Sequence, residues 1–255
     1  MSFIRVSVEQ HVACLELERG KANALNGELL QELAHALEQA AADAEVRAVV
    51  LASALPRVFC GGFDATEVFA YERPAMLNFF TRFVRLFERL RMLPKPVVCA
   101  LEGHAFAGGA ILALAADFRL MAESATLSVN EVDLAVALPA AMIHALAVSA
   151  SPELARSMLL GAEVVSASRA LAGGLVSQVL PANEVRAAAV QRARFLGEKP
   201  SLAFVVHKRA LDPFRGELLP DSEIEATIDS WFGAEASSRR QALQQRLAAK
   251  TKPRA

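Results

Sequence analysis

The sequence predicts an α/β fold with largely parallel strands, and two observations carry that prediction. Residues 48–52 and 96–101 are continuous apolar runs rich in β-branched residues, which is typical of strands covered on both faces. Each run is followed by a glycine-rich segment and then by apolar residues at helical spacing. The chain has 255 residues, 54% of them hydrophobic, so it is long enough to bury a large core.

The first half of the chain alternates between strand and helix patterns. Residues 3–8 and 12–17 predict two strands joined as a hairpin. Apolar residues at helical spacing then predict a helix over 27–43. Pro74 opens a second helical pattern, since proline suits the first turn of a helix. That pattern carries an aromatic stripe suited to either the core or a pocket wall: Phe79, Phe80, Phe83 and Phe87.

The second half begins with short elements and ends in helices. The expected short elements are a buried helix at 108–116 and strands at 119–121, 126–128 and 176–180. Helices dominate from Pro152 onward, and the last two are expected at 221–232 and 236–249. Their apolar residues have no sheet left to cover, which predicts packing on a neighbouring subunit. These residues are Ile224, Ile228, Trp231, Phe232, Leu243 and Leu247.

Composition excludes several classes of protein. The 27 basic and 28 acidic residues give a net charge of −1, which argues against a nucleic-acid or membrane partner. Three cysteines without a C-x-x-C pair predict a reducing compartment and no disulfide framework. The five histidines have no ligand spacing, so no metal site is expected. The N-terminus lacks the apolar core of a signal peptide, and the prediction is a cytoplasmic protein.

The two glycine-rich segments are the main candidates for chemistry. The first reads Phe59-Cys60-Gly61-Gly62-Phe63-Asp64, and the second runs from Gly103 to Ala110 as GHAFAGGA. Each can aim unpaired backbone N–H groups at one point, and two such donors make an oxyanion hole. Tight turns and close packing explain the same glycines without any chemistry. A P-loop is excluded because no Lys-Ser/Thr follows Gly108, and no G-x-S-x-G motif indicates a serine hydrolase.

These segments and their flanks resemble the enoyl-CoA hydratase/isomerase family, which has a crotonase-like fold. The resemblance covers residues 3 to about 212, and the order and spacing of its pieces make it specific. The pieces are Lys21-Ala22-Asn23-Ala24-Leu25, the first glycine segment through Asp64, the second through Asp117, Asn130-Glu131-Val132, Gly161-Ala162 through Ala170, Gly174-Leu175-Val176 and Val179. It implies a spiral of repeated β-β-α units, with a core at 1–195 and a C-terminal helical trimerisation region at 196–255.

The resemblance also implies a site for an acyl-CoA thioester. In this family two backbone N–H groups hold the thioester oxygen, and by position they belong to Phe63 and Gly108. The bulky ring of Phe63 departs from the small residue that is common there, which is expected to narrow or redirect the acyl pocket. The other substrate-binding residues implied are Ala22, Ala24, Gly61, Gly62, Asp64, Ala65, Phe106, Asn130 and Pro139. No separate cofactor is expected, because coenzyme A is part of the substrate.

The catalytic prediction depends on one departure from the family pattern. Family hydratases carry a glutamate at the position of Ile111 and a second one on a later loop, here Glu131. Hydration uses two carboxylates, whereas moving a double bond needs one base. Asn130-Glu131 resembles the family's 3-enoyl-CoA to 2-enoyl-CoA isomerases, so Glu131 is the predicted acid/base. Its apolar neighbours predict a raised pKa, although an isolated glutamate is commonly solvent-facing.

Several residues keep alternative interpretations. Asp64 suits a helix cap better than a base, and Asp133 is a weaker candidate for a second acid. Cys60 fits a buried apolar residue better than a nucleophile. Lys208 and Arg209 suit either coenzyme A phosphates or a solvated helix face. The leading hypothesis is an isomerase that assembles as a homo-trimer or hexamer; a hydratase, another acyl-CoA lyase and a non-catalytic acyl-CoA binder remain alternatives.

Overall fold

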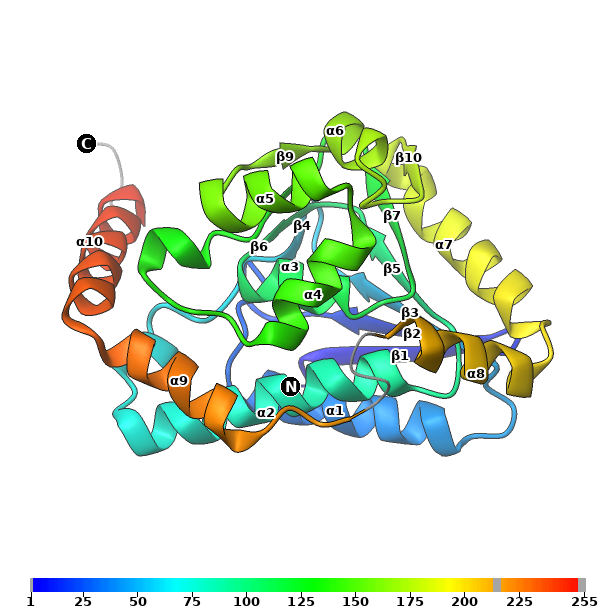
Figure 1. Cartoon of the computed structure of the whole chain (residues 1–255). Helices are drawn as coiled ribbons and strands as arrows, with labels where there is room; N and C mark the ends of the chain where they lie inside the picture. The colour runs from blue at the N-terminus through cyan, green and yellow to red at the C-terminus, as the bar shows by residue number, and fades with distance from the viewer. Residues whose placement is uncertain (1, 213–216, 252–255) are drawn as a thin grey trace.

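A six-stranded sheet forms the centre of the molecule (Figure 1). The computed structural model describes residues 2–212 and 217–251. The strand order is β1 (Ile4–Glu9), β2 (Val12–Leu17), β3 (Ala48–Ser53), β5 (Val97–Leu101), β7 (Phe118–Ala122) and β10 (Gln178–Leu180). The β1–β2 hairpin is antiparallel and the other pairs are parallel. The predicted α/β class with a largely parallel sheet is therefore confirmed.

A second, smaller sheet was not predicted from the sequence. It consists of β4 (Val58–Cys60), β6 (His104–Phe106), β8 (Thr126–Ser128) and β9 (Val165–Ser166). Only β8 was expected as a strand, because β4 and β6 overlap the glycine-rich segments and β9 is only two residues long. The first glycine-rich segment therefore begins within β4 and the second contains β6, and the large-sheet strands β3, β5 and β7 each lead first into a strand of the second sheet. This arrangement is the β-β-α repeat that the family resemblance implies.

Helices cover both sides of the large sheet. The first eight are α1 (Gly27–Ala42), α2 (Arg73–Met92), α3 (Gly108–Leu114), α4 (Ala140–Ser149), α5 (Pro152–Gly161), α6 (Ala167–Ala172), α7 (Ala182–Gly197) and α8 (Ser201–Leu211). The predicted start of α1 is confirmed, because the Asn26 side chain accepts a hydrogen bond from Leu29 N–H and caps the helix. The first glycine segment opens the 3₁₀ helix η1 (Val68–Ala70) rather than an α-helix. Helix α7 runs along one flank of the sheet, and α1 and α2 lie below it (Figure 1).

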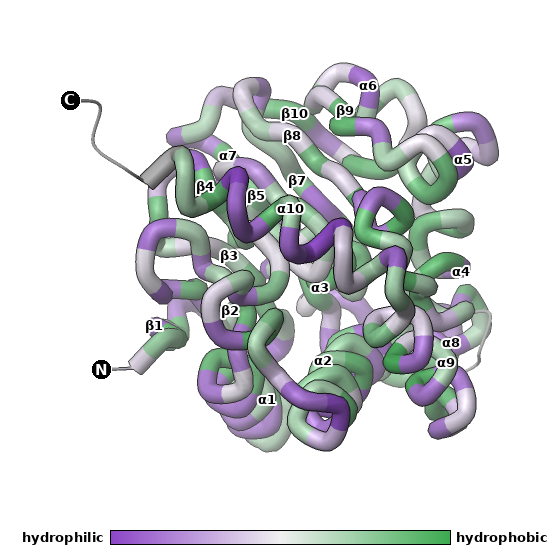
Figure 2. Tube along the Cα trace, turned by 90° about the vertical axis from the view of Figure 1, so that its left-hand side faces the viewer, coloured by the Kyte–Doolittle hydropathy of each residue, from purple (hydrophilic) through white to green (hydrophobic). Residues whose placement is uncertain are grey.

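The last two helices are present but pack differently from the prediction. Helix α9 (Asp221–Phe232) packs against α2, and α10 (Ala234–Thr251) crosses in front of the core in Figure 2. Ile224, Ile228 and Trp231 are at most 3% exposed within this single chain. The prediction that the apolar residues of these helices pack on a neighbouring subunit was therefore wrong for these three, because they cover their own chain, whereas Leu247 of α10 is 43% exposed.

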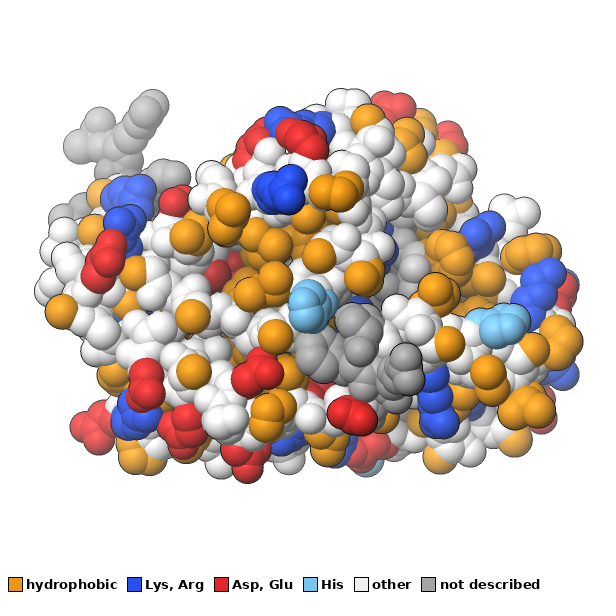
Figure 3. All heavy atoms as spheres, in the orientation of Figure 1, with side chains coloured by type: hydrophobic (Ala, Val, Ile, Leu, Met, Phe, Trp, Pro, Cys, Tyr) orange, Lys and Arg blue, Asp and Glu red, His pale blue; other side chains and the backbone are white. Residues whose placement is uncertain are grey.

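Other exposed apolar side chains lie on α8 and on α4 and α5 (Figure 3). Helix α8 has no fully buried residue, and its Leu202, Val206 and Leu211 are 55–79% exposed. Ile143 and Leu160 are exposed on α4 and α5. None of the helices in the described part of the chain is both long and apolar enough to cross a membrane.

Candidate active site

The two glycine-rich segments lie directly against each other. A Cβ atom added to Gly62 would lie 3.1 Å from Phe106 O and 3.6 Å from Gly108 N. A Cβ atom on Gly109 would lie 2.3 Å from Cys60 O, so a side chain there is excluded. Gly62 also has a φ of 92°, which favours glycine. The parallel pairing of β4 with β6 produces this contact and brings the predicted donors to one place.

At this contact the backbone N–H groups of Phe63 and Gly108 have no acceptor among the described residues. Neighbouring N–H groups are paired: Gly61 donates to Ala22 O at 2.8 Å, and Asp64 donates to Leu25 O at 2.9 Å. Ala107, directly before Gly108, has the backbone angles φ 47° and ψ −126°, which are rare for a residue with a side chain. The first turn of α3 thus leaves Gly108 N–H unpaired, as helix N-termini do.

The contact borders an apolar cavity of about 220 Å³. Its residues come from both glycine segments, from α2, from the 130–138 loop and from the two last helices. They are Gly61, Phe63, Ala65, Phe69, Met76, Phe80, Phe83, Phe106, Ala107, Gly108, Asn130, Glu131, Leu134, Val136, Leu138, Thr227, Trp231, Leu243 and Leu247. The Phe63 ring packs edge-on against Phe83 at 5.1 Å and would contact a side chain at Gly108 within 3 Å. The aromatic stripe of α2 therefore does form part of a pocket wall.

Glu131 is the only ionisable side chain that lines this cavity in the described structure. It begins the 3₁₀ helix η2 (Glu131–Leu134), and burial raises its pKa to about 7. Its Oε2 atom is closed to solvent and has no hydrogen-bond partner in the described structure; the same is true of Asn130 Oδ1. A carboxylate with a pKa near neutrality and a free oxygen is suited to move protons.

The remaining predicted binding residues lie beside the cavity rather than in its wall. Ala22 and Ala24 support the first glycine segment, since Ala22 O accepts from Gly61 and Ala24 O accepts from Arg19. The Asp64 carboxylate accepts from the Thr66 and Glu67 N–H groups and pairs with Arg19 Nη1 at 2.7 Å. Asp64 therefore caps a turn that precedes η1 and not the helix that was predicted, because the N-cap residue of η1 is Glu67. The carbonyl of Gly62 accepts from Leu25 N–H, and Pro139 is the N-cap residue that precedes α4.

Other candidates are excluded by their surroundings. Burial raises the pKa of Cys60 to about 12, and its thiol donates to Asn23 O, so it is not a nucleophile. Asp133 is exposed and lies outside the cavity wall. Lys208 is buried and donates to Asp117 Oδ2 at 2.9 Å, so it is not available to coenzyme A phosphates. Ile111 is fully buried in α3.

Sequence reasoning missed the C-terminal part of the cavity wall. Thr227 and Trp231 of α9 and Leu243 and Leu247 of α10 all line it. The apolar residues of these helices indicated that the helices cover another surface, but that surface was predicted to belong to a neighbouring subunit. Helix α10 contacts η2, and its Leu243 and Leu247 form one side of the cavity of its own chain.

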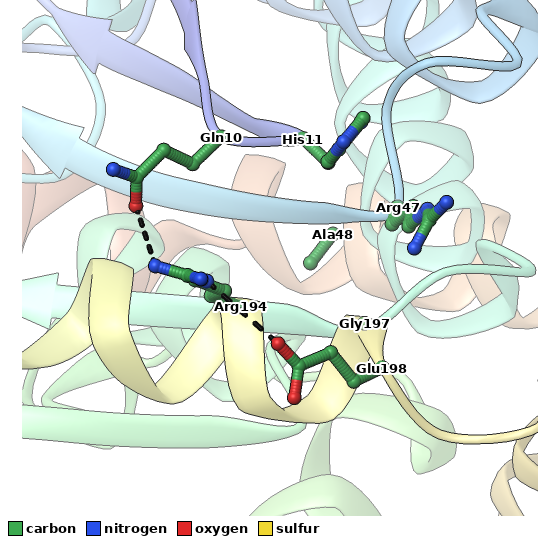
Figure 4. Close-up of a pocket in the computed structure, with 7 residues that line it drawn as sticks. All are labelled: Gln10, His11, Arg47, Ala48, Arg194, Gly197 and Glu198. Carbon is green, nitrogen blue, oxygen red and sulfur yellow. Dashed lines mark hydrogen bonds and ion pairs between the residues drawn. The ribbon is translucent and has the colours of Figure 1, made fainter.

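A second hollow, of about 300 Å³, lies between the β1–β2 hairpin, the start of β3 and the end of α7 (Figure 4). Arg194 Nη1 donates to Gln10 Oε1 at 2.8 Å, and its Nε lies 3.7 Å from Glu198 Oε1. His11 and Arg47 also border it and are exposed. A further hollow, of about 510 Å³, lies along α4 and α5 and also has Glu131 in its lining. Phe63 and Gly108 line neither of these two hollows, so the 220 Å³ cavity that they share with Glu131 is the candidate active site.

The fold agrees with what comparison with known proteins shows. Residues 7–251 match the model of the enoyl-CoA hydratase/isomerase family, so the chain belongs to that family and is an enzyme of it. It is 35% identical over 212 residues to the 2,3-dehydroadipyl-CoA hydratase of Escherichia coli K12, covering 83% of this chain and 82% of that protein.

Two further relatives illustrate the range of names in the family. The mouse mitochondrial methylglutaconyl-CoA hydratase is 31% identical over 195 residues, which cover 74% of this chain and 62% of that protein. The crystal structure of the human mitochondrial delta3-delta2-enoyl-CoA isomerase superposes with a TM-score of 0.92 and 24% identity, covering 98% of this chain and 100% of that one. At that identity the likeness shows the fold alone.

Proposed function

We propose that the protein is an acyl-CoA isomerase that moves a double bond from the 3- to the 2-position of an enoyl-CoA thioester. One observation carries this proposal: among the described residues, Glu131 is the only ionisable side chain in the cavity wall. Migration of a double bond needs one base, whereas hydration needs one group to activate water and a second to deliver a proton to carbon. The fully buried, apolar Ile111 supplies neither.

In the proposed mechanism Glu131 acts as base and then as acid. Its carboxylate removes a proton from C2 of the 3-enoyl thioester, and the electron pair moves onto the thioester oxygen. The N–H groups of Phe63 and Gly108 hold that oxygen as an enolate forms. The protonated carboxyl then returns the proton to C4, the carbonyl re-forms, and the double bond lies between C2 and C3. A pKa near 7 suits a group that must both take and return a proton.

The binding residues expected from the resemblance keep supporting roles in this proposal. Ala22 and Ala24 are proposed to border coenzyme A beside the first glycine segment. Gly61, Ala65, Phe106 and Asn130 belong to the cavity wall and are proposed to contact the acyl thioester. The substrate supplies coenzyme A, so no separate cofactor takes part.

A hydratase is the second candidate, because curated relatives, including the E. coli protein, are named hydratases. The test is a coupled assay of purified protein with 3-enoyl-CoA and 2-enoyl-CoA of matched acyl lengths. We expect isomerisation to be faster than hydration at every length. Faster hydration of 2-enoyl-CoA would reject the single-base mechanism.

The matched variants are Glu131→Gln and Asp133→Asn. Both remove one carboxylate from η2, but only Glu131 lines the cavity. The first variant is expected to lose turnover and the second to keep it. Equal losses in both would point to a general effect on the η2 turn rather than to a base.

We also propose that the protein assembles as a homo-trimer or hexamer. The apolar residues that support this assembly are the exposed ones of α8, α4 and α5. An eleven-residue helix without a buried apolar residue is poorly packed for an isolated chain. Sedimentation that shows a stable monomer at micromolar concentration would reject this assembly.

A further inference from the structure

The loop at residues 19–25 lies against the first glycine segment and holds its backbone on both sides of Phe63. Leu25 N–H donates to Gly62 O at 2.8 Å, and Leu25 O accepts from Asp64 N–H at 2.9 Å. These two hydrogen bonds form an isolated parallel bridge between Leu25 and Phe63. The bridge is the direct backbone connection between the loop and the residue that carries a proposed oxyanion donor.

This bridge sets the direction of the Phe63 N–H group. In a trans peptide the C=O and N–H bonds point in opposite directions. Because Gly62 O accepts from Leu25, the Phe63 N–H of the same peptide points away from Leu25. That N–H has no acceptor among the described residues. The aim of this donor therefore depends on the bridge remaining closed.

Arg19 joins the two segments beside the bridge. Its Nη1 atom donates to Ala24 O at 2.9 Å and to Asp64 Oδ2 at 2.7 Å. Ala24 directly precedes Leu25 in the loop. Asp64 directly follows Phe63, so a single nitrogen atom connects the two chain segments that form the bridge. The side chains of Arg19 and Asp64 are 18% and 16% exposed, and a partly buried ion pair is screened less than a surface pair.

The Asp64 carboxylate is held in its charged form. Burial would raise its pKa, but hydrogen bonds from Arg19 and from the Glu67 and Thr66 N–H groups outweigh that effect and lower the pKa. The ion pair with Arg19 is therefore present at neutral pH. Arg19 itself does not line the cavity, so it reaches the reacting atoms only through the backbone at Phe63.

We propose that Arg19 is a positioning residue for the oxyanion hole. Its guanidinium holds the Leu25–Phe63 bridge closed and so keeps the Phe63 N–H aimed at the thioester oxygen. A donor stabilises an oxyanion only where the charge develops, and a displacement of about 1 Å costs roughly 100-fold in rate. This inference rests on the proposed function, because it assumes that Phe63 and Gly108 hold a thioester oxygen.

The first measurement is turnover of 3-enoyl-CoA by folded variants, with folding checked by circular dichroism. Arg19→Met removes the charge and the donors, and it should lower kcat roughly 10- to 100-fold with a much smaller change in KM. Arg19→Lys should recover most of that loss, because one nitrogen atom makes both contacts and an ammonium group can replace it. An unchanged kcat in Arg19→Met would overturn the inference.

Asp64→Asn tests whether the ion pair carries the effect. It weakens the same connection from the other side, so it should lower kcat in the same way as Arg19→Met. The double variant should be little worse than the poorer single variant, because both changes break one interaction. Losses that multiply in the double variant would overturn the inference, since the two residues would then act independently.

Arg169→Met is the matched control for the loss of an ion pair. Arg169 pairs with Glu153 at 2.9 Å and also with Glu163, and it does not line the cavity. This variant should keep the kcat of wild type. A loss equal to that of Arg19→Met would show a general effect of removing an arginine and would overturn the inference.

A second measurement reports on the donor directly and needs no turnover. It is the infrared stretching frequency of the carbon-13-labelled thioester carbonyl in a saturated, unreactive acyl-CoA bound to the protein. Hydrogen bonds to that oxygen lower the frequency on binding. The lowering should be smaller in Arg19→Met and close to wild type in Arg19→Lys and Arg169→Met.

The spectrum separates failure of the inference from failure of the proposed function. A role of Arg19 in stability alone would leave the frequency of the bound thioester unchanged in folded Arg19→Met, and that result would overturn the inference only. If wild type bound no acyl-CoA, or bound it without lowering the carbonyl frequency, the proposed oxyanion hole would be removed and this inference with it.

Discussion

Glu131 and Glu102 have the same shifted pKa but very different surroundings. Burial raises the pKa of each to about 7. Glu102 follows β5, and its Oε2 accepts from Arg186 Nη2 at 2.6 Å, an ion pair that opposes the effect of burial. Arg186 also pairs with the buried Glu16, so two carboxylates share one cation. Glu131 Oε2 has no partner in the described structure and faces no cation in the cavity wall.

This difference shows that a raised pKa alone does not identify a catalytic group. Glu102 links β5 to α7 through Arg186, and its oxygen is already occupied. Glu131 combines the same pKa with a free oxygen, a cavity and two unpaired N–H donors. Only that combination allows a substrate proton to be taken and the resulting charge to be stabilised.

The largest expected effect separates the two glutamates directly. Glu131→Gln should lower turnover of 3-enoyl-CoA by roughly 100- to 10,000-fold, the range for a positioned acid/base, with little change in binding. Glu102→Gln should keep turnover near that of wild type, because Glu102 does not line the cavity. Steady-state kinetics on folded variants measures both. A similar loss of turnover in both variants would contradict the assignment of Glu131, and not Glu102, as the base.

The next largest effect concerns the backbone N–H donor of Gly108, which lines the same cavity as Glu131, whereas Glu102 does not line it. Gly108→Pro removes the N–H, and a lost oxyanion donor costs roughly 100- to 1,000-fold in turnover. Gly108→Ala keeps the N–H, but its Cβ would lie 2.8 Å from the Phe63 ring, so a smaller loss is expected. Circular dichroism checks that each variant folds. Full activity in a folded proline variant would exclude Gly108 N–H as a donor.

The pH dependence of turnover gives a further separation. The base must be charged to remove the C2 proton, so activity should rise with pH through about 7. Between pH 7 and pH 5 the charged fraction of such a group falls roughly 50-fold, and turnover should fall with it. Glu102→Gln should show the same profile as wild type. If the pH profile of turnover shifted in Glu102→Gln but stayed unchanged when residues beside Glu131 were replaced, Glu102 and not Glu131 would be the base.

The smallest expected effect is on stability. The pKa of Glu131 is higher in the folded state than in the unfolded state, so wild type loses stability as pH rises from about 4.5 to about 7. Glu131→Gln removes that loss. The free energy of unfolding of Glu131→Gln relative to wild type should therefore be about 1–2 kcal/mol higher at pH 8 than at pH 4, a value reduced from the full pKa shift because the residue is partly exposed. Glu102→Gln should gain less, because it also breaks the pair with Arg186. Denaturant unfolding at the two pH values measures the difference.

The sequence by itself determined the α/β class, the large-sheet strands and the long helices. Uniformly apolar β-branched runs such as Ala48–Ser53 and the spaced leucines of α1 carry that information locally, because period and propensity act over neighbouring residues. The order of the motifs around Gly62, Gly108 and Glu131 was also readable. Their roles as donors and base remain predictions that the geometry supports.

Only the tertiary structure decided how these pieces meet. The strands β4 and β6 are three residues long, so their pairing, which brings Gly62 against Gly108, depends on contacts between distant segments. The sequence of α9 shows that one side of the helix is apolar, but it does not show which surface that side covers. In the structure Trp231 of α9 packs against Phe63 of the same chain. Burial of Glu131 and pairing of Lys208 with Asp117 were equally unreadable, because the surroundings of a charge depend on residues far away in sequence.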